Sequence, residues 1–429
     1  MTKTVAFCTL GCKVNQYETE AMTEMFLNCG YKVKNFEDVC DIYIINTCTV
    51  TGMSDRKSRQ MIRRAKHNNP NSIIAVVGCY SQVSPDEVAK IEGVNLIIGT
   101  KERKNIVELV ESCTKDATLL KVEDALKNRE YEDIWVTTYD DRERAYVKIE
   151  DGCTEFCSYC IIPYARGPVR SRPTDDIVAE VKRLADAGFK EVVLTGIHIG
   201  SYGRDLKDVS LKNVIQLVHD VDGIERIRLG SVEPRTLSED FICAISKLPK
   251  VCDHFHISLQ SGCDETLKRM NRKYTCDEYY KSVELLRKYF NNPAITTDIM
   301  VGFAGETEEE FKQSLAFMQK VGFAEAHVFA YSIRKGTKAE KMPNQVSPEV
   351  KDIRSKQMAN LCNKMQIDYA NAFVGKTVSV LVERNIGEDV YEGHMTNYVK
   401  VHVKSEKDIS HMIIDAEIKE QKDGILYSY

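Results

Sequence analysis

Three cysteines in one short stretch constrain this chain more than any other feature. Cys153, Cys157 and Cys160 lie in the segment 151–167, at a spacing that lets a single loop surround a metal centre. Thiolates are soft ligands that suit iron–sulfur clusters or zinc, and both centres usually take four ligands. The next cysteine or histidine along the chain is His198. A centre with three protein ligands keeps one position open for a substrate or cofactor. The loop therefore predicts a metal centre that takes part in a reaction. The alternative is a structural zinc site whose fourth ligand comes from elsewhere in the fold.

A second set of three cysteines is spread over the first eighty residues. Three strand-like runs alternate with helix-like stretches, which is typical of a parallel α/β domain of Rossmann-like type. The runs are 4–9, 41–46 and 73–77, and they are followed by Cys12, Cys48 and Cys79. Since the carboxyl ends of parallel strands share one sheet edge, we expect these cysteines to converge on a second centre. The alternative is three unrelated buried thiols.

The alternation of strands and helices continues beyond residue 145. Six strand-like runs, each followed by a helix-like segment, predict a parallel sheet curled into a partial (β/α)6 barrel with its site at the strand carboxyl ends. These runs are 145–149, 191–195, 226–229, 254–259, 294–301 and 325–331. Short β-rich runs after Gly375 predict a small antiparallel β-barrel. The predicted parts are an N-terminal domain, a linker, the partial barrel and a C-terminal barrel, at 1–115, 116–138, 139–371 and 372–429.

Composition and charge exclude several classes of protein. The 429 residues carry a net charge of -5, so any binding of nucleic acid must use local basic patches. Fifteen cysteines without a secretory signal pattern indicate thiols and metal ligands in a reducing compartment. The longest apolar runs, such as 72–78, are far too short to span a membrane. We therefore expect a cytoplasmic protein with no membrane association.

The loop around Cys153 matches a known signature, with Tyr159 as its aromatic residue. It resembles the C-x-x-x-C-x-(aromatic)-C sequence of the radical S-adenosylmethionine (SAM) enzymes. Over nearly its full length the chain further resembles the radical SAM methylthiotransferases, which have a three-cysteine N-terminal domain, a partial barrel and a C-terminal TRAM barrel. The motifs that carry this resemblance are TLGCKVNQYE at 9–18, TGIHIGSYG at 195–203, SVEP at 231–234, SLQSG at 258–262 and DIMVGF at 298–303.

The resemblance implies two [4Fe-4S] clusters and two molecules of SAM. The open iron of the cluster on Cys153, Cys157 and Cys160 would bind the SAM that yields a radical. A second SAM would methylate sulfur at an auxiliary cluster on the N-terminal cysteines. A low-potential electron donor such as flavodoxin or ferredoxin would be needed. Tyr159, Thr195, Gly196, Ser258 and Gln260 are the candidate SAM-binding residues, although a buried polar pair is an equally good interpretation of the last two.

The expected substrate is a tRNA base. The LGCKVNQ and SVEP motifs resemble the branch that methylthiolates carbon two (C2) of N6-threonylcarbamoyladenosine next to the anticodon. The alternatives within the family are isopentenyladenosine in tRNA and an aspartate of a ribosomal protein. Glu233 is a candidate for contact with the base or its side chain, the alternative being a surface carboxylate. The alternative outside catalysis is a zinc-stabilised RNA-binding protein.

Basic residues near both cysteine sets are candidates for phosphate contacts. Arg56, Arg59 and Arg63 are expected on the helix after Cys48, while Arg166 and Arg170, with Arg172, follow the other set. Positive charge around the mouth of a site attracts RNA phosphates. The alternative is a solvated helix face, which is the usual role of a charge run.

Overall fold

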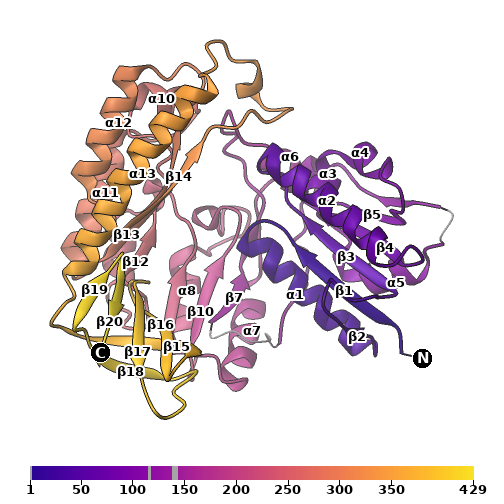
Figure 1. Cartoon of the computed structure of the whole chain (residues 1–429), viewed down its shortest axis with the longest axis horizontal. Coiled ribbons are helices and arrows are strands. Elements are labelled where there is room, and N and C mark those ends of the chain that lie inside the picture. The colour runs from indigo at the N-terminus through magenta and orange to yellow at the C-terminus, as the bar shows by residue number, and fades with distance from the viewer. Residues whose placement is uncertain (1, 115–116, 138–143) are drawn as a thin grey trace.

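The computed structural model describes residues 2–114, 117–137 and 144–429, which form three successive parts. The N-terminal part lies on one side of a curved central sheet, and the C-terminal strands pack below it beside the long helix α13 (Pro348–Asn371) (Figure 1). None of the helices in these ranges is long and apolar enough to cross a membrane.

The N-terminal part is an all-parallel sheet, as predicted, in the order β2-β1-β3-β4-β5-β6. Alternate strand residues face the two sides, so Ile42 and Ile44 join one apolar core and Tyr43 and Ile45 join another. The strands are β1 (Thr4–Thr9), β2 (Lys32–Val33), β3 (Ile42–Thr47), β4 (Ile73–Gly78), β5 (Leu96–Ile98) and β6 (Leu119–Lys121). The helices are α1 (Lys13–Asn28), α2 (Gly52–Asn68), α3 (Cys79–Val83), α4 (Pro85–Ala89) and α5 (Ile106–Glu111), with the 3-10 turn η1 (Arg103–Asn105).

Part of the segment predicted as a linker belongs to the domains on either side of it. β6 pairs in parallel with β5 as the last strand of the N-terminal sheet, so this domain extends beyond residue 115. The 3-10 turn η2 (Ala125–Lys127) follows, and Ile134 and Val136 are buried in the core of the central part. The segment lacks periodicity because its residues pack singly against two different domains. The predicted boundary at 138/139 lies outside the described residues.

The central part has six parallel strands, which confirms the predicted partial barrel. Two three-stranded sheets, β11-β10-β7 and β12-β13-β14, are joined by the bridges Ile227–Val251 and Val232–Ile257. The strands are β7 (Arg144–Lys148), β10 (Glu191–Thr195), β11 (Arg226–Leu229), β12 (His254–His256), β13 (Ala294–Val301) and β14 (Glu325–Ala330), with a small ribbon of β8 (Glu150–Asp151) and β9 (Arg170–Ser171).

Helices cover the outer face of this half-barrel and share one large apolar core with its strands. Three of them, α8, α11 and α12, begin with a capping box, in which the side chains of the cap residue and of the third helical residue satisfy backbone N–H groups. The helices are α6 (Ile162–Arg166), α7 (Thr174–Asp186), α8 (Leu211–His219), α9 (Glu239–Ile245), α10 (Asp264–Arg269), α11 (Cys276–Tyr289), α12 (Glu308–Val321) and α13. The 3-10 turns are η3 (Ile199–Ser201), η4 (Pro234–Thr236) and η5 (Lys338–Lys341).

The C-terminal part is one curled sheet in the order β18-β15-β16-β17-β20-β19. It differs from the predicted antiparallel barrel in one pairing, because β17 and β20 run parallel. The strands are β15 (Thr377–Gly387), β16 (Val390–Met395), β17 (Lys400–Lys404), β18 (Ile413–Glu417), β19 (Glu420–Lys422) and β20 (Ile425–Tyr427).

Arginines of the half-barrel hold the C-terminal sheet in place. Arg226 donates to Ser379 Oγ at 3.0 Å, and Arg228 donates to the carbonyl oxygen of Thr396 at 2.8 Å. Both arginines lie beside the fully buried carboxylate of Glu191. Burial opposes ionisation of Glu191, but the charges of Arg228 and Arg144 lower its pKa to about 2.

The variant Glu191→Gln is expected to lose about 3 kcal/mol of stability at neutral pH, because the arginines lose their buried counter-charge. A lowered carboxyl pKa stabilises the fold above the unfolded value and stops doing so as pH falls through the folded value. The difference between wild type and variant in urea unfolding should therefore narrow between about pH 4.5 and 2. The control is Glu420→Gln, whose half-buried carboxylate pairs with Lys422 at the surface. If the difference in unfolding free energy between wild type and Glu191→Gln did not change with pH, the lowered pKa of Glu191 would be contradicted.

Candidate active site

The structure brings the three N-terminal cysteines together at one sheet edge. Cys12, Cys48 and Cys79 follow the neighbouring strands β1, β3 and β4. Burial raises the pKa of each thiol, and each is also raised by the charge of another cysteine of the set. Gly11 permits this approach: its φ is +114°, and a Cβ there would lie 2.8 Å from the Cys48 Cβ. A side chain at position 11 would therefore collide with Cys48 and Asn15.

The second set lies in the loop between β8 and α6. Burial, followed by the charge of Cys157, raises the pKa of Cys160 to about 12, and burial also raises that of Cys153. Arg272 Nη1 donates to Cys157 Sγ at 3.2 Å. The loop is anchored where the Cys153 N–H donates to the carbonyl oxygen of Gly167 at 2.9 Å. Binding of a metal requires that the ligand thiols lose their protons.

The spacing of the sulfur atoms tests which centre fits. Among the described residues, neither set holds its three sulfur atoms within 4.8 Å of one another. A tetrahedral zinc ion with Zn–S bonds of about 2.3 Å would hold them about 3.8 Å apart. A cubane needs wider spacing because each thiolate binds a different iron atom. The thiols as they stand are therefore too far apart for one tetrahedral zinc ion, whereas three thiols are the donor set that an iron–sulfur cluster with one open iron would take.

A buried ionic network connects the two sets of cysteines. Arg166 Nε donates to Cys79 Sγ at 3.2 Å, and Nη2 donates to Asn15 Oδ1 at 2.7 Å. The same guanidinium pairs with Glu18 and, at 3.3 Å, with Asp151. Asp151 opens the loop that carries the other cysteines. One arginine thus joins an N-terminal cysteine to the central loop.

The predicted RNA contacts of Arg166 and Arg170 are wrong. Their exposures are 0% and 2%, and Arg170 donates to the carbonyl oxygen of Arg166 at 2.7 Å. Arg172 is equally buried and pairs with Glu180. The sequence shows three basic residues close together, but only the tertiary structure shows that carboxylates from other elements surround them.

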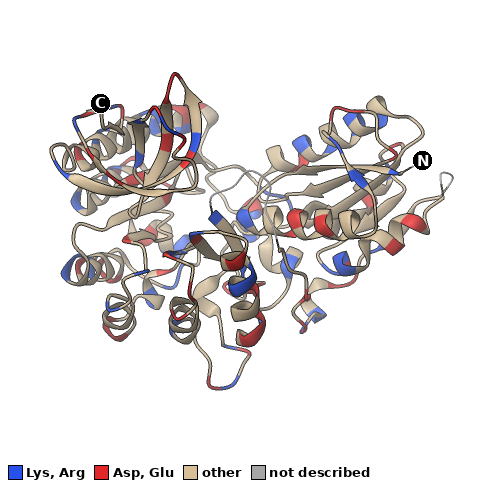
Figure 2. Ribbon diagram, turned by 90° about the horizontal axis from the view of Figure 1, so that it is seen from below, with Lys and Arg blue, Asp and Glu red and all other residues tan. Residues whose placement is uncertain are grey.

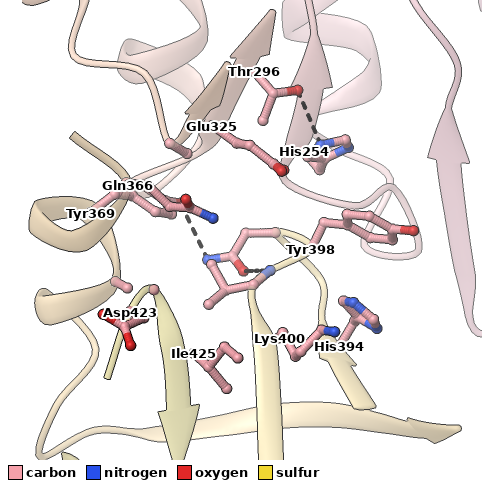
Figure 3. Close-up of a pocket in the computed structure, with 15 residues that line it drawn as sticks. His254, Thr296, Glu325, Gln366, Tyr369, His394, Tyr398, Lys400, Asp423 and Ile425 are labelled. Atoms are coloured by element: carbon pink, nitrogen blue, oxygen red, sulfur yellow. Dashed lines mark hydrogen bonds between the residues drawn. The ribbon is translucent and has the colours of Figure 1, made fainter. Parts of the chain in front are cut away.

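A cavity of about 540 Å³ lies between the N-terminal cysteines and the half-barrel. Cys12 lines it from one side and Thr195 and Gly196 from the other. The cavity continues past residues of the barrel interior to Tyr398 of the C-terminal part, and its remaining lining includes Lys13, Ser231, His254, His256, Thr296, Asp298, Glu325 and His327. The strand residues and Tyr398 meet in Figure 3, where a second pocket shares His254, Thr296, Glu325 and Tyr398.

The predicted SAM-binding residues lie near the strand carboxyl ends. Gly196 follows β10 directly, and a Cβ there would lie 2.7 Å from the Oε2 of the buried Glu150. Tyr159 packs edge-on against Phe303, with ring centroids 6.3 Å apart. Ser258 and Gln260 follow β12, and Gln260 has a φ of +71°. Their roles toward SAM stay predictions.

Glu233 is not a surface carboxylate. It is buried beside the cysteine loop, where Arg272 Nη2 lies 2.7 Å from its Oε1 and His198 Nε2 lies 3.4 Å from its Oε2. Burial raises the pKa of Glu233, but His198 and Arg272 outweigh this effect and lower it. Arg272 also contacts Cys157, so Glu233 is tied to the cluster loop, and its predicted contact with the base is still untested.

The basic face of α2 remains available for RNA. Arg56 and Arg63 are exposed, whereas Arg59 is half-buried and donates to Tyr80 Oη at 3.0 Å. Figure 2 shows Lys and Arg interspersed with Asp and Glu over all three parts from this side. Any contact of α2 with RNA phosphates would therefore be made by a local basic patch, and this contact stays a prediction.

Sequence reasoning missed several residues of the cavity. His254 and His256 stand two apart in β12, and this alternation was a signal that they share a face. Lys13 lies within a matched motif, directly after Cys12. For Tyr398 and Arg272 no signal existed, because they reach the site from loops far away in the sequence.

Comparisons with known proteins agree with this geometry. Residues 147–318 match the radical SAM superfamily, and residues 4–99 match the uncharacterized protein family UPF0004. The chain is 41% identical to threonylcarbamoyladenosine tRNA methylthiotransferase MtaB of Bacillus subtilis, over 97% of this chain and 93% of that protein. It is 37% identical to tRNA-2-methylthio-N(6)-dimethylallyladenosine synthase of Thermoanaerobacter pseudethanolicus, over 87% and 81%.

Among solved structures, the radical SAM methyltransferase TsrM from Kitasatospora setae, with cobalamin and a [4Fe-4S] cluster bound, is similar in fold. Its TM-score is 0.58 at 14% identity, over 90% of this chain and 82% of that one. The extent of the match to the curated relatives confirms the predicted family. The chain therefore belongs to the radical SAM tRNA methylthiotransferases, whose cofactors are SAM and two [4Fe-4S] clusters.

Proposed function

We propose that this enzyme methylthiolates C2 of N6-threonylcarbamoyladenosine next to the anticodon of tRNA. The observation that carries the proposal is the single cavity bordered by Cys12 on one side and by Thr195 and Gly196 on the other. An adenine in this cavity would lie beside Cys12 of the auxiliary set and beside Thr195 and Gly196, the predicted contacts of SAM. The relatives named for threonylcarbamoyladenosine, at 41% to 36% identity, support this choice of base.

Two molecules of SAM are consumed in the proposed reaction, one as methyl donor and one as radical source. When bound at the cluster of Cys153, Cys157 and Cys160, SAM supplies the means to remove the C2 hydrogen atom, which no acid or base of the protein removes at neutral pH. The hydrogen atom would leave with the fragment of that SAM, and the methylthio group held at the centre on Cys12, Cys48 and Cys79 would take its place. A low-potential donor such as flavodoxin or ferredoxin supplies the electrons, in the cytoplasm where tRNA is modified.

The chain's own residues position and shield these groups. The cysteines hold the clusters, while Arg166 and Arg272 donate to the sulfur atoms of Cys79 and Cys157. Hydrogen bonds to cluster sulfurs set the reduction potential. The C-terminal sheet, at the other end of the cavity, fits the role of an RNA-binding module, and a splayed single-stranded base suits a site of this depth.

Nucleosides from the tRNA of a deletion strain test the base. We expect N6-threonylcarbamoyladenosine to remain and its 2-methylthio form to disappear, because only the final substitution at C2 is lost. Mass spectrometry of digested tRNA measures both, and the wild-type gene should restore the product while Cys160→Ala should not.

Three outcomes would contradict the proposed substrate or favour another one. Retention of the 2-methylthio form in a strain without a second such enzyme would refute it. Loss of the methylthio group from isopentenyladenosine would favour that branch, which the dimethylallyladenosine synthases among the relatives represent. Loss of a methylthio group from a ribosomal-protein aspartate would favour the third branch.

A further inference from the structure

One cation in the cavity lacks a counter-charge. Lys13 is the first residue of α1, directly after Cys12, and its side chain is exposed to the same cavity. Within 2–114, 117–137 and 144–429, it makes no hydrogen bond or ion pair. The ring of Tyr146 lies beside it, with its centroid 5.9 Å from Nζ. Lys13 is therefore free to bind a ligand.

The surroundings of Lys13 carry excess positive charge. The charges that act on Lys13 are those of Arg228 and Arg144, which repel it, and that of Glu191, which attracts it. Both arginines already pair with Glu191: Nε of Arg228 lies 2.7 Å and Nε of Arg144 lies 3.1 Å from its Oε1. The cations of this cluster are Lys13, Arg144, Arg226 and Arg228, against the carboxylates Glu191, Glu383 and Asp253. Four cations against three carboxylates leave this wall attractive to an anion.

The opposite wall of the cavity carries negative charge. Asp298 and Glu325 line the cavity from β13 and β14, at the far edge of the half-barrel from β7, against which α1 packs. A ligand with one anionic end would therefore be oriented in the cavity, with that end toward Lys13.

The N6-threonylcarbamoyl group ends in a carboxylate. C2 and C6 of adenine flank the same ring nitrogen, so the N6 substituent lies close to the carbon that reacts. A base with C2 directed at Cys12 would bring its substituent to the residue that follows Cys12. We propose that Lys13 binds the carboxylate of the N6-threonylcarbamoyl group and thereby selects this base. The inference rests on the proposed function and adds the residue that recognises the substrate.

The same lysine would disfavour an uncharged substituent. An isopentenyl group would remove water from Lys13 without offering it a hydrogen-bond acceptor, and an unpaired desolvated cation is costly. Selection would thus combine attraction of one substituent with rejection of the other.

Binding of an anticodon stem-loop RNA tests the proposal without turnover. We would compare RNA carrying the threonylcarbamoyl group as the free acid with RNA carrying its methyl ester, using fluorescence anisotropy and cluster-loaded protein. Wild type should bind the acid about 10- to 100-fold more tightly, the range for hydrogen bonds to charged groups. Lys13→Met should bind acid and ester equally, whereas Lys13→Arg should keep most of the preference. Lys281→Met, exposed on the outer helix α11, is the matched control.

The outcomes separate this inference from the proposed function. A wild type that binds the modified and unmodified stem-loops equally would count against the proposed base. The role of Lys13 would be overturned if the wild type bound modified RNA more tightly than unmodified RNA but bound the acid and the ester equally. An acid preference retained in Lys13→Met would overturn it too. Iron content and circular dichroism check that variant, and Lys13→Gln replaces it if it does not fold.

Discussion

Replacing Cys153, Cys157 and Cys160 together by alanine is expected to lower the iron content of the reconstituted protein from about eight to about four atoms per chain. Methylthiolation should fall below detection, because the radical source is lost. The second cluster should remain, since Cys12, Cys48 and Cys79 lie on a separate sheet edge. Iron and sulfide analysis after anaerobic reconstitution measures the effect.

A matched variant controls for the loss of three thiols. Cys29, Cys113 and Cys243 belong to neither set, and their replacement by alanine should leave the iron content unchanged. About four atoms in wild type falling to none would mean that the N-terminal cysteines hold no cluster. A colourless protein containing zinc would instead restore the RNA-binding alternative.

The variant Arg166→Met is expected to destabilise the protein by about 3–5 kcal/mol, the usual cost of removing one partner from a buried ionic network. Glu18 and Asp151 would keep Lys148 and Arg103 as partners but lose the guanidinium that lies between them. Burial raises the pKa of Glu18, but the charges of Arg103, Arg166 and Lys148 outweigh burial and lower this pKa to about 2. The three cations therefore interact strongly with the Glu18 carboxylate. Urea unfolding followed by circular dichroism measures the loss.

The same variant should disturb the auxiliary cluster, because Cys79 would lose its donor. Electron paramagnetic resonance of the reduced protein should show a changed signal for that cluster, while the signal of the other cluster stays. Arg64→Met is the control: its partner Glu37 is also exposed, and such surface pairs contribute at most about 1 kcal/mol. Equal destabilisation by the two variants would contradict the role of Arg166.

Local pattern was sufficient to predict the architecture. Strand and helix periodicity identified the six strands of the half-barrel and the parallel N-terminal sheet, because hydrophobic alternation is set within each element. The placement of Cys12, Cys48 and Cys79 after successive strands predicted their convergence, since parallel topology fixes where carboxyl ends meet. The segment around β6 was misjudged because a three-residue strand leaves too short a pattern.

The sequence by itself determined the cysteine sets, the order of the parts and the family, all of which depend on residue spacing along the chain. Only the tertiary structure decided what each charge does. Arg166 and Arg170 look like surface arginines until Glu18 is seen to pair with the first and Asp151 with the second. Among the described residues, in contrast, Lys13 faces the cavity beside the ring of Tyr146 with no carboxylate in ion-pair contact. The physical reason is that the energy of a charge depends on its solvation and its neighbours in space. Such neighbours can come from distant segments, as Glu18 does for Arg166, 148 residues away.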